Sequence, residues 1–475
     1  MKVTISNIIH IEDPTQAVIN YCKNNLVFKN PDYDKKRRMG VWLGNTTKTI
    51  TIYNSTPTSI DVPIGCFNDL YAIHPIPSDY TDFSVSKSVN VESHINLRNY
   101  QEPCLEAVKT FFNGILILPA GTGKTLSALH CFGTLKQKTL WITHTKELLN
   151  QAKDECEANI NCTTSTITEG QCDTSGDIVF ATVQTLVNVI DHGEIGQDTF
   201  GMVICDECHH TVISADAVMQ FEKCITYFAA RYKIGLTATL HTANGLHVVT
   251  PKLIGPVIYE MVKEGNEFVG YYKGKDIIHV PASMFQIPAR IHLIPTSYDA
   301  SGKDIYDRYN QTINFSKLIS DISSDTKRNN EIVNLLKTLK GSTIIVGDRV
   351  EQLKTLATQF GKDAIVVDGK TKKDIREKGL ERVKSGQVKY LFASYKLICE
   401  GFNAPILENL VMVTPVKDLR IVVQSIGRVQ RPYKDKKIAN VYDLVDDVGK
   451  LDRFLRERKK IYKKEGYEID DRRNI

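Results

Sequence analysis

Short apolar runs alternate with stretches of helical periodicity from about residue 93 onward. Consecutive apolar positions, rather than alternate ones, are typical of strands buried on both faces of a parallel sheet. A first series of runs comprises Gly114–Leu118, Thr139–Thr143, Ile178–Ala181, Met202–Cys205 and Lys233–Leu236. A second series comprises Thr343–Val346, Ala364–Val367, Lys389–Ala393, Asn409–Val413 and Asn440–Leu444. The pattern therefore predicts an α/β protein with two doubly wound parallel-sheet lobes in tandem.

Residues 1–92 follow a different pattern. Polar and apolar residues alternate between Lys48 and Tyr53, among the turn residues Asn54, Pro57, Pro63 and Gly65. Alternation with frequent turns predicts a small, mainly-β N-terminal domain with some helix. The irregular stretch from about 240 to 330 is expected to close the first lobe and open the second. The expected domains are 1–92, then lobes over 93–285 and 286–448, and a basic C-terminal helix over 449–475.

The composition predicts a soluble protein kept in a reducing interior. Of 475 residues, 42% are hydrophobic and 24% charged, which is ordinary for a globular protein. No apolar run is long enough to span a membrane, and the first residues place acids where a signal peptide needs an apolar core. The 11 cysteines are scattered and odd in number, which favours buried thiols over a disulfide framework. We therefore expect a cytoplasmic protein with no membrane partner.

Positive charge is concentrated in two places, although the net charge of +5 is mild. One cluster is Lys35, Lys36, Arg37 and Arg38, and the other is the stretch from Arg453 to Lys464, where Glu457 is the single acid. Basic runs are commonly solvated helix faces, and the functional alternative is contact with a phosphate backbone. Near the first cluster, Trp42 is expected either to lie in the core of the small domain or to be exposed and stack on bases. In the second, Phe454 and Tyr462 are expected to pack one helix face on the second lobe, leaving the basic face free.

A glycine-containing loop follows the run Ile115–Leu118 and precedes the helical pattern Leu126–Leu135. Its sequence, Leu118 to Thr125, has the layout of a P-loop, although Leu118 replaces the usual first glycine. In such a loop the backbone N–H groups and the helix N-terminus surround a phosphate. Lys124 is expected to reach the β- and γ-phosphates of ATP and the Thr125 hydroxyl to hold Mg²⁺.

Two adjacent carboxylates, Asp206 and Glu207, end the apolar strand Met202–Cys205. In P-loop ATPases, acids at this place hold Mg²⁺ and activate the attacking water. We expect Asp206 to hold the metal through its hydration shell and Glu207 to take the proton from water. Cys205 and Cys208 also form a CxxC followed by histidines, which offers a zinc or redox alternative. The acids inside the CxxC and the lack of a second ligand pair make that alternative the weaker one.

The order Asp206-Glu207-Cys208-His209 downstream of a P-loop resembles the DExH pattern of superfamily 2 helicases. Other motifs of that family are matched in order by Leu97–Gln101, His144–Leu148, Thr182–Thr185, Thr237–Thr239, Glu400–Pro405 and Gln424–Arg431. The resemblance implies two tandem RecA-like lobes that hydrolyse ATP with Mg²⁺ and move along nucleic acid.

The resemblance also implies roles for individual residues. The nucleotide would be bound by Gln101, Gly121, Thr122, Gly123, Lys124, Thr125, Asp206 and Gly401, with the amide of Gln101 reading the adenine. Hydrolysis would be coupled to movement by His209, Thr237, Thr239 and Gln424, and the strand would be gripped by Thr145, Lys146 and Thr185. Arg428 and Arg431 would neutralise the γ-phosphate, with Arg431 as the arginine finger. Asn403 stands where many relatives have Asp, which weakens any charge-based role at that position.

The forms of three motifs, at residues 144–149, 400–405 and 424–428, are similar to the XPB-like branch, which has phage and poxviral members. The segments from Asn30 to Gly40 and from Val62 to Gly65, with Ile52 and Tyr53 between them, resemble the small domain before the motor in the branch-migration helicases of large phages such as T5. This resemblance implies a DNA helicase or translocase acting on forks and four-way junctions, with 3′-to-5′ movement. It also implies a monomer, recombination or replication proteins as partners, and the host cytoplasm as location.

Three alternatives remain. An RNA-directed or transcript-release motor of the poxviral type would be stimulated by RNA. An inactive scaffold would bind nucleic acid without turnover, although Lys124, Asp206, Glu207 and Arg431 are all present. The motor subunit of a restriction enzyme would need a nuclease, for which the segments around the lobes leave little room.

Overall fold

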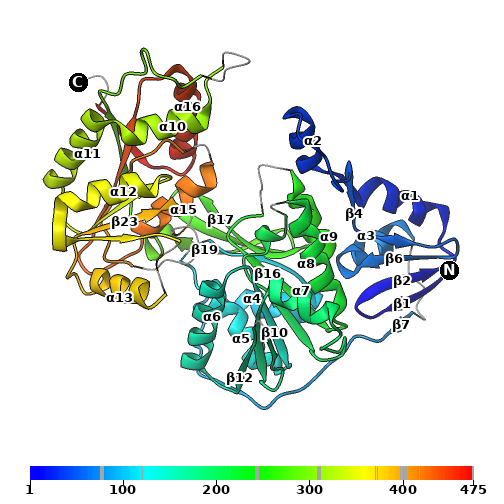
Figure 1. Cartoon of the computed structure of the whole chain (residues 1–475). Helices are drawn as coiled ribbons and strands as arrows, with labels where there is room; N and C mark the ends of the chain where they lie inside the picture. Colours follow the sequence, from blue (N-terminus) through cyan, green and yellow to red (C-terminus); the bar gives the residue numbers. More distant parts are fainter. Residues whose placement is uncertain are drawn as a thin grey trace. The chain divides into compact units, whose positions relative to one another are not determined.

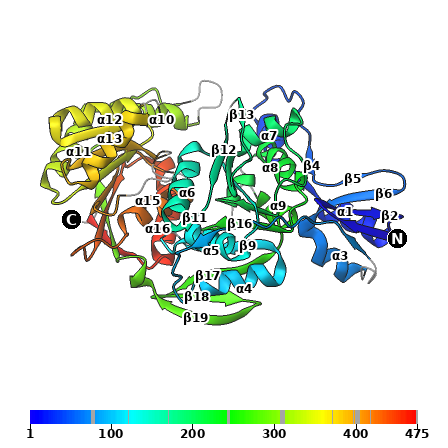
Figure 2. The same ribbon diagram turned by 90° about the horizontal axis from the view of Figure 1, so that it is seen from below.

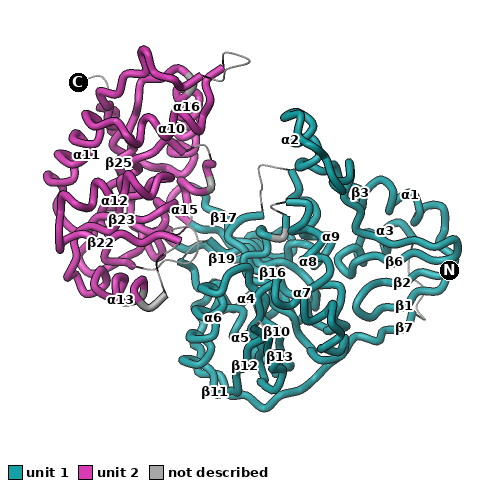
Figure 3. Tube along the Cα trace, viewed as in Figure 1, with its two compact units in different colours: residues 1–264, 268–280 teal, residues 265–267, 281–475 magenta. Residues whose placement is uncertain are grey.

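The computed structural model describes the whole chain except residues 75–79, 120, 169, 213, 241–244, 307–311, 370, 372, 396, 398–403, 417 and 473–475. Contacts divide the chain into two compact units (Figure 3). Unit 1 is Met1–Glu264 with Phe268–Val280, and unit 2 is Gly265–Glu267 with Pro281–Ile475. None of the helices within the described ranges combines the length and the apolar character that a membrane span requires.

Unit 1 begins with a five-stranded sheet in the order β5-β6-β2-β1-β7 (Figure 1). Its strands are β1 (Lys2–Ile5), β2 (Ile8–Glu12), β5 (Asn54–Ser55), β6 (Ser59–Pro63) and β7 (Thr81–Asp82). The same segment contains α1 (Gln16–Asn25), η1 (Ile64–Cys66) and α3 (Phe67–Ile73). Alternate residues such as Ile9 and Ile11 are buried, so one face of the sheet covers a core. The expected sheet with some helix is present, although the helices Gln16–Asn25, Pro31–Arg38 and Phe67–Ile73 are together as extensive as the strands of this segment.

A separate two-stranded ribbon in the same segment pairs β3 (Val27–Lys29) with β4 (Thr49–Thr51). The chain between the two strands, residues 30–48, forms a projection that we call the arm. It contains the short helix α2 (Pro31–Arg38), which lies at the end of the ribbon in Figure 1.

The first lobe is built on a ten-stranded sheet in the order β13-β12-β14-β10-β15-β16-β9-β17-β18-β19. The strands foreseen from the sequence are β9 (Asn113–Ile117), β10 (Thr139–Thr143), β14 (Ile178–Thr182), β15 (Met202–Cys205) and β16 (Tyr232–Thr237). They are parallel to one another and nearly all buried, because helices cover them. These helices include α4 (Glu102–Phe111), α5 (Lys124–Leu135), α6 (Lys146–Asn159), α7 (Val183–Asp191), α8 (Ala215–Tyr227) and α9 (Val249–Leu253).

Further strands, which the sequence did not indicate, extend this sheet at both edges. One edge carries β12 (Thr164–Thr168) and β13 (Gln171–Cys172). At the other edge lie β17 (Val257–Glu264), β18 (Glu267–Tyr272) and β19 (Lys275–Pro281), side by side in Figure 2. A small ladder joins β8 (Glu92–Ser93) to β11 (Ile160–Asn161).

The N-terminal sheet and the first lobe share one continuous hydrophobic core, and both belong to unit 1. A buried lysine of β16, Lys233, donates to the carbonyls of Asn7 and Ile225, both at 2.9 Å. Lys252 pairs with Asp69, and the backbone of Gly65 lies so close to the Pro251 and Lys252 carbonyls that a Cβ would collide with them. The boundary expected at residue 92 therefore separates two sheets but not two independent cores.

Unit 2 contains a seven-stranded, mainly parallel sheet in the order β22-β23-β21-β24-β25-β20-β26. Its strands are β20 (Ala289–Pro295), β21 (Thr343–Gly347), β22 (Ala364–Val367), β23 (Tyr390–Ser394), β24 (Asn409–Met412), β25 (Ala439–Val445) and β26 (Glu468–Asp471). All strands of the second predicted series are present. The accompanying helices include α10 (Phe315–Ser324), α11 (Thr326–Thr338), α12 (Val350–Ala357), α13 (Lys373–Lys384), α15 (Leu419–Val429) and α16 (Gly449–Lys464). The predicted α/β class with two parallel-sheet lobes is confirmed.

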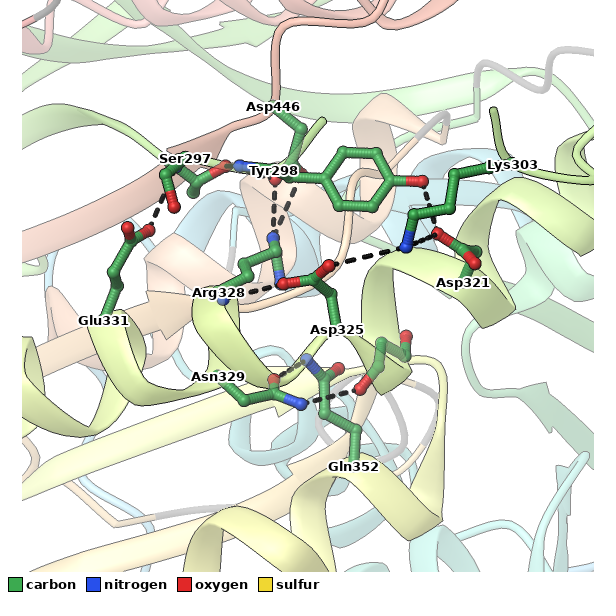
Figure 4. Close-up of polar contacts among 12 residues, drawn as sticks. Ser297, Tyr298, Lys303, Asp321, Asp325, Arg328, Asn329, Glu331, Gln352 and Asp446 are labelled. Atoms are coloured by element: carbon green, nitrogen blue, oxygen red, sulfur yellow. Dashed lines mark hydrogen bonds and ion pairs between the residues drawn. The ribbon is translucent and has the colours of Figure 1, made fainter. Parts of the chain in front are cut away.

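A buried ion pair ties α11 to the end of β25 (Figure 4). Arg328 and Asp446 are fully buried side chains joined by two hydrogen bonds of 2.5 and 3.0 Å. Thr296 also donates to Asp446, and Asn329 bridges Ser323 to Gln352. The cluster fixes α10, α11 and α12 against the sheet through directed polar contacts.

The C-terminal segment differs from the helix expected over 449–475. Helix α16 ends at Lys464, and β26 then pairs in parallel with β20. Tyr462 is fully buried and donates to Asp443, while Phe454 contacts Phe315. The expected packing of these two aromatic residues is confirmed, but the segment is part of the unit 2 sheet rather than a separate helix.

Candidate functional site

The predicted P-loop connects β9 to α5 in unit 1. Gly121 and Gly123 have φ angles of +86° and +81°, a left-handed conformation that glycine adopts without steric cost. The Thr122 hydroxyl donates to the Pro119 carbonyl at 2.7 Å and closes the turn. No side chain caps the N-terminus of α5, which begins at Lys124. The loop therefore offers an anion the uncapped end of a helix beside a lysine, which fits a phosphate group.

Gln101 stabilises this loop through hydrogen bonds to its backbone. Its Nε2 donates to the carbonyls of Thr122 and Gly123 at 3.1 and 3.2 Å, and its Oε1 accepts from the backbone of Arg98. A Cβ at position 123 would lie 2.6 Å from that Nε2, so the glycine also allows the close approach. The sequence had assigned Gln101 to reading adenine, and this role stays a prediction because the amide is engaged by the chain itself. Tyr100, which the sequence did not single out, also donates to Thr122.

The two carboxylates follow β15 as expected, and Glu207 lies beside the P-loop lysine. Lys124 Nζ is 3.3 Å from Glu207 Oε1. Glu207 has a φ angle of +48°, uncommon for a residue other than glycine. Its backbone N–H donates to Asp206 Oδ1 at 2.9 Å, and the Asp206 N–H donates to the carbonyl of Ile142 in β10. The turn therefore directs one carboxylate to Lys124 and leaves the other buried at the strand end.

The pKa values of the two acids are shifted in opposite directions. Burial and the neighbouring charge of Glu207 raise the pKa of Asp206 to about 7. Burial alone would raise the pKa of Glu207 as well, but Lys124 and His209 hold it well below its usual range. Glu207 is therefore ionised at neutral pH, whereas the nearby Lys124 offsets the burial of Asp206 only in part. This donor set fits Mg²⁺ bound between Asp206, the half-buried Thr125 and a phosphate.

A short chain of polar contacts connects Glu207 to the end of β16. His209 Nδ1 lies 3.3 Å from Glu207 Oε2 and 3.0 Å from the Thr237 hydroxyl. That hydroxyl donates to the carbonyl of Thr239 at 2.7 Å and accepts from its N–H. The predicted coupling residues His209, Thr237 and Thr239 are thus joined to the hydrolysis site. In addition, the Leu118 N–H donates to the carbonyl of Thr237, which ties this chain to the P-loop.

The structure also joins two motifs through a contact that the sequence did not suggest. The rings of His144 and His210 stack with centroids 3.7 Å apart, and His210 also contacts His209. Because His144 directly follows β10, the stack links the Thr145 motif to the acidic turn. Cys205 and Cys208 are buried in the lobe 1 core, and burial raises the pKa values of both thiols. No group of three or more His, Cys, Asp or Glu side chains among the described residues is arranged to hold a metal ion.

The expected strand contacts differ in accessibility. Lys146 is exposed at the start of α6, while the Thr145 side chain caps that helix by accepting from the Leu148 N–H. Thr185 is buried, and its hydroxyl bonds to Thr182 at 3.0 Å. Lys146 is therefore the side chain best placed for a phosphate, whereas the two threonines shape the helix starts.

The predicted basic cluster lies on α2 in the arm. Lys35, Arg37 and Arg38 are exposed, and Lys36 donates to the Thr46 hydroxyl at 2.7 Å. Trp42 is 86% exposed, so the expectation that it lies in the core is wrong; stacking on bases stays a prediction.

In unit 2, the two predicted arginines lie at the end of α15. Arg428 belongs to its last turn, and Arg431 follows two residues beyond the helix end. Burial and the neighbouring charge of Arg428 lower the pKa of Arg431 to about 10, which leaves it cationic at neutral pH. Two half-buried guanidinium groups of the same charge favour an anion between them. Gln424 is half-buried on the same helix, while Gly401 and Asn403 lie outside the described residues.

Comparison with known proteins agrees with this arrangement. Residues 94–242 match the family described as "Type III restriction enzyme, res subunit", and residues 327–433 match "Helicase conserved C-terminal domain". The chain is 26% identical to the DNA 3'-5' translocase XPB2 of Sulfurisphaera tokodaii, over 73% of this chain and 81% of that protein. It is 27% identical to the probable helicase D10 of Escherichia phage T5, over 73% of this chain and 71% of that protein.

A solved structure supports the fold. Saccharomyces cerevisiae Dbp5, solved with RNA and ADP BeF3, is similar with a TM-score of 0.53 and 12% identity, covering 86% of this chain and 94% of that one. The lobes of unit 1 and unit 2 are thus tandem RecA-like folds. Together with the P-loop, the DExH turn and the paired arginines, these similarities show that the chain belongs to the superfamily 2 helicases, as an ATP-dependent helicase of the XPB-like type.

Proposed function

We propose that the chain is a DNA motor that unwinds or branch-migrates forked and four-way-junction DNA in recombination, repair or replication. One observation supports coupling between hydrolysis and movement. The P-loop, the Thr145 motif, the Thr185 motif, the acidic turn and Thr237 all follow the carboxyl ends of neighbouring parallel strands. Groups expected to bind nucleotide and groups expected to bind a strand therefore share one edge of one sheet.

The residues of this edge would divide the work as follows. Bound ATP with Mg²⁺ supplies the phosphoanhydride bond whose hydrolysis drives the motor. Lys124 would leave Glu207 for the phosphates, which frees Glu207 to take a proton from water. His209 and Thr237 would transmit the change at Glu207 to the segment after β16. Arg428 and Arg431, which belong to unit 2 and not to this edge, keep the role that the family resemblance implies for them, neutralising charge on a phosphate.

Several features favour DNA and a direction of movement. The relative from Sulfurisphaera tokodaii is named a DNA 3'-5' translocase, which supports 3′-to-5′ movement here. Exposed basic side chains on α2 and Lys146 suit a phosphate backbone. Backbone contacts carry little sequence information, so binding should be sequence-independent and weakened by salt.

The test is ATP hydrolysis by the purified chain, alone and with single-stranded DNA, duplex, fork, four-way junction and RNA. Stimulation by forks and junctions, followed by strand displacement on the same substrates, is the expected result. Lys124→Ala serves as the control without phosphate binding. Stimulation by RNA alone would instead support an RNA-directed motor, and tight binding without turnover would contradict a motor of either kind.

A further inference from the structure

We propose that the arm, residues 30–48, meets DNA at the branch point, where Trp42 stacks on an exposed base and α2 holds the adjoining duplex backbone. This inference rests on the proposed DNA motor and identifies the part that engages the junction.

The tip of the arm is apolar and open to solvent. Met39, Val41 and Trp42 are 66%, 50% and 86% exposed. Leaving a large apolar side chain in water forgoes about 1.5–3 kcal/mol relative to burial. Three neighbouring residues of this kind on one short segment suit a surface that becomes covered when a partner binds.

The Trp42 ring is already held in position by the arm. A Cβ added at Gly44 would lie 3.2–3.5 Å from three atoms of the indole ring, so the ring packs over the glycine backbone. Gly44 has a φ angle of +53°, which a residue with a side chain rarely adopts. The ring therefore needs little further ordering before it can stack on a base.

The rest of the arm is also ordered by its own hydrogen bonds. The Asn30 side chain caps α2 by accepting from the N–H groups of Asp32 and Tyr33, and it donates to the Thr47 carbonyl at 2.8 Å. The Asn30 N–H donates to the Lys48 carbonyl, which closes the base of the arm. Lys36 crosses to Thr46. An ordered projection can keep the two DNA strands of a fork apart, whereas a flexible loop would move with the DNA.

Charge favours nucleic acid over protein as the partner. Between Asn30 and Lys48 the sequence has five basic residues and two acidic ones, and no side chain of α2 is buried. A flat aromatic ring beside basic side chains is the combination that binds single-stranded nucleic acid, through stacking and backbone contacts. An acidic protein surface would complement the basic charge of the arm, but it would not account for the exposed, flat indole ring of Trp42.

The base of the arm is fixed at the functional edge of the first lobe. Asp32 Oδ2 accepts from the N–H of Ala215 at 3.1 Å, where α8 begins. Helices α7 and α8 pack on each other; α7 contains Thr185, and α8 comes after the acidic turn of Glu207. An acid at the start of α8 also suits the positive end of that helix. The arm is therefore joined to the edge of the sheet that carries the strand-binding and hydrolysis motifs.

The first test uses the chain's own fluorescence. The chain has two tryptophans, and Trp141 is fully buried, so a change on titration with DNA reports on Trp42. Forked and single-stranded DNA should quench the emission, and blunt duplex of the same length should quench it much less. Trp42→Phe should abolish the quenching while keeping the affinity for forks.

The second test compares variants in fork unwinding. Trp42→Ala should lower fork affinity and strand displacement about tenfold, as loss of one base–aromatic stack does. ATP hydrolysis stimulated by single-stranded DNA should stay within about twofold, because no hydrolysis residue lies in the arm. Trp42→Phe should restore displacement. Tyr71→Ala, which removes an exposed aromatic residue of α3 outside the arm, is the matched control and should change nothing.

The outcomes separate this inference from the proposed function. Hydrolysis stimulated by DNA, with no quenching and full displacement by Trp42→Ala, would overturn the role of the arm and leave the motor intact; the tip would then be a protein-binding surface. Quenching by forks without any stimulated hydrolysis would overturn the motor and retain the contact of Trp42 with bases.

Discussion

At the scale of single residues, Glu207 shows how backbone conformation sets up chemistry. Its positive φ angle costs on the order of 1 kcal/mol or more for a residue with a side chain. This conformation directs the two adjacent acids differently: Glu207 pairs with Lys124, and Asp206 accepts from the Glu207 N–H at the strand end. The pKa of Glu207 is held low by Lys124, so its basicity would rise once that lysine turns to a phosphate.

Replacing Glu207 with glutamine should lower ATP turnover by on the order of 10²–10⁴, because the amide keeps the shape but cannot accept a proton. Nucleotide binding should be nearly unchanged, since Lys124 and the loop remain. Single-turnover hydrolysis and nucleotide titration would measure the two effects. Glu157→Gln, at an exposed residue paired with Lys153, is the control. A loss of nucleotide binding as large as the loss of turnover in Glu207→Gln would refute the assigned role.

Lys233 should make the stability of unit 1 depend on pH. Burial lowers its pKa from 10.5 to about 7, so the unfolded chain binds more protons between these values. The penalty is complete below pH 7 and is relieved as pH rises toward 10.5. Relative to Lys233→Met, the free energy of unfolding of the wild type should therefore rise between pH 7 and 9, by at most about 1.4 kcal/mol per pH unit. Parallel pH profiles for the two proteins would contradict this prediction, and Lys2→Met, at an exposed pair with Glu12, is the control.

At the scale of elements, buried polar contacts fix helices that apolar packing alone would leave less defined. Helix α11 is the example, because Arg328 reaches from it to Asp446 at the end of β25 (Figure 4). Breaking one member of a buried ion pair leaves the other charge unpaired.

Arg328→Ala should destabilise unit 2 by about 3–5 kcal/mol, the usual cost of leaving a buried charge without its partner. Urea unfolding followed by circular dichroism would measure the change. Lys354→Ala removes the cation of an exposed pair with Glu351 on α12, and the change there should be below about 1 kcal/mol. Similar losses in the free energy of unfolding for the two substitutions would mean that burial does not determine how much an ion pair contributes to stability.

Elements with a strong local pattern were predictable, and those defined by distant pairing were not. All ten apolar runs proposed as strands are strands, because consecutive apolar residues suit only the interior of such a sheet. Strands β17 to β19 and β26 have no such pattern, because exposed and buried positions mix along them. The hydrolysis motifs were predictable because their spacing is local, whereas the His144–His210 stack depends on two strands lying side by side. The exposure of Trp42 depends on the arm standing clear of the sheet, which no local pattern shows.

At the scale of the whole molecule, the chain has fewer independently folding units than the domains expected from its sequence. The N-terminal sheet and the first lobe share a core, while unit 2 has cores made of its own residues. A fragment of residues 281–475 should therefore fold alone, with a cooperative thermal transition by circular dichroism. A fragment of residues 93–280 should aggregate, because removal of the N-terminal sheet exposes the shared core and leaves Lys233 without the Asn7 carbonyl. A soluble, cooperatively melting 93–280 fragment would contradict this view.

The arm, in contrast to the N-terminal sheet, begins and ends at facing positions of one two-stranded ribbon. Lys29 and Thr49 face each other across the ribbon, so the arm enters and leaves through one pair of opposed residues. A tight two-residue turn could close the ribbon at the same place without changing the register of β3 and β4. Insertions, deletions and exchanges between related genes could thus alter this projection while the motor keeps its fold. In evolutionary terms, the nineteen residues of the arm, 30–48, can change in sequence much faster than the motor lobes, and substrate preference can diverge with them.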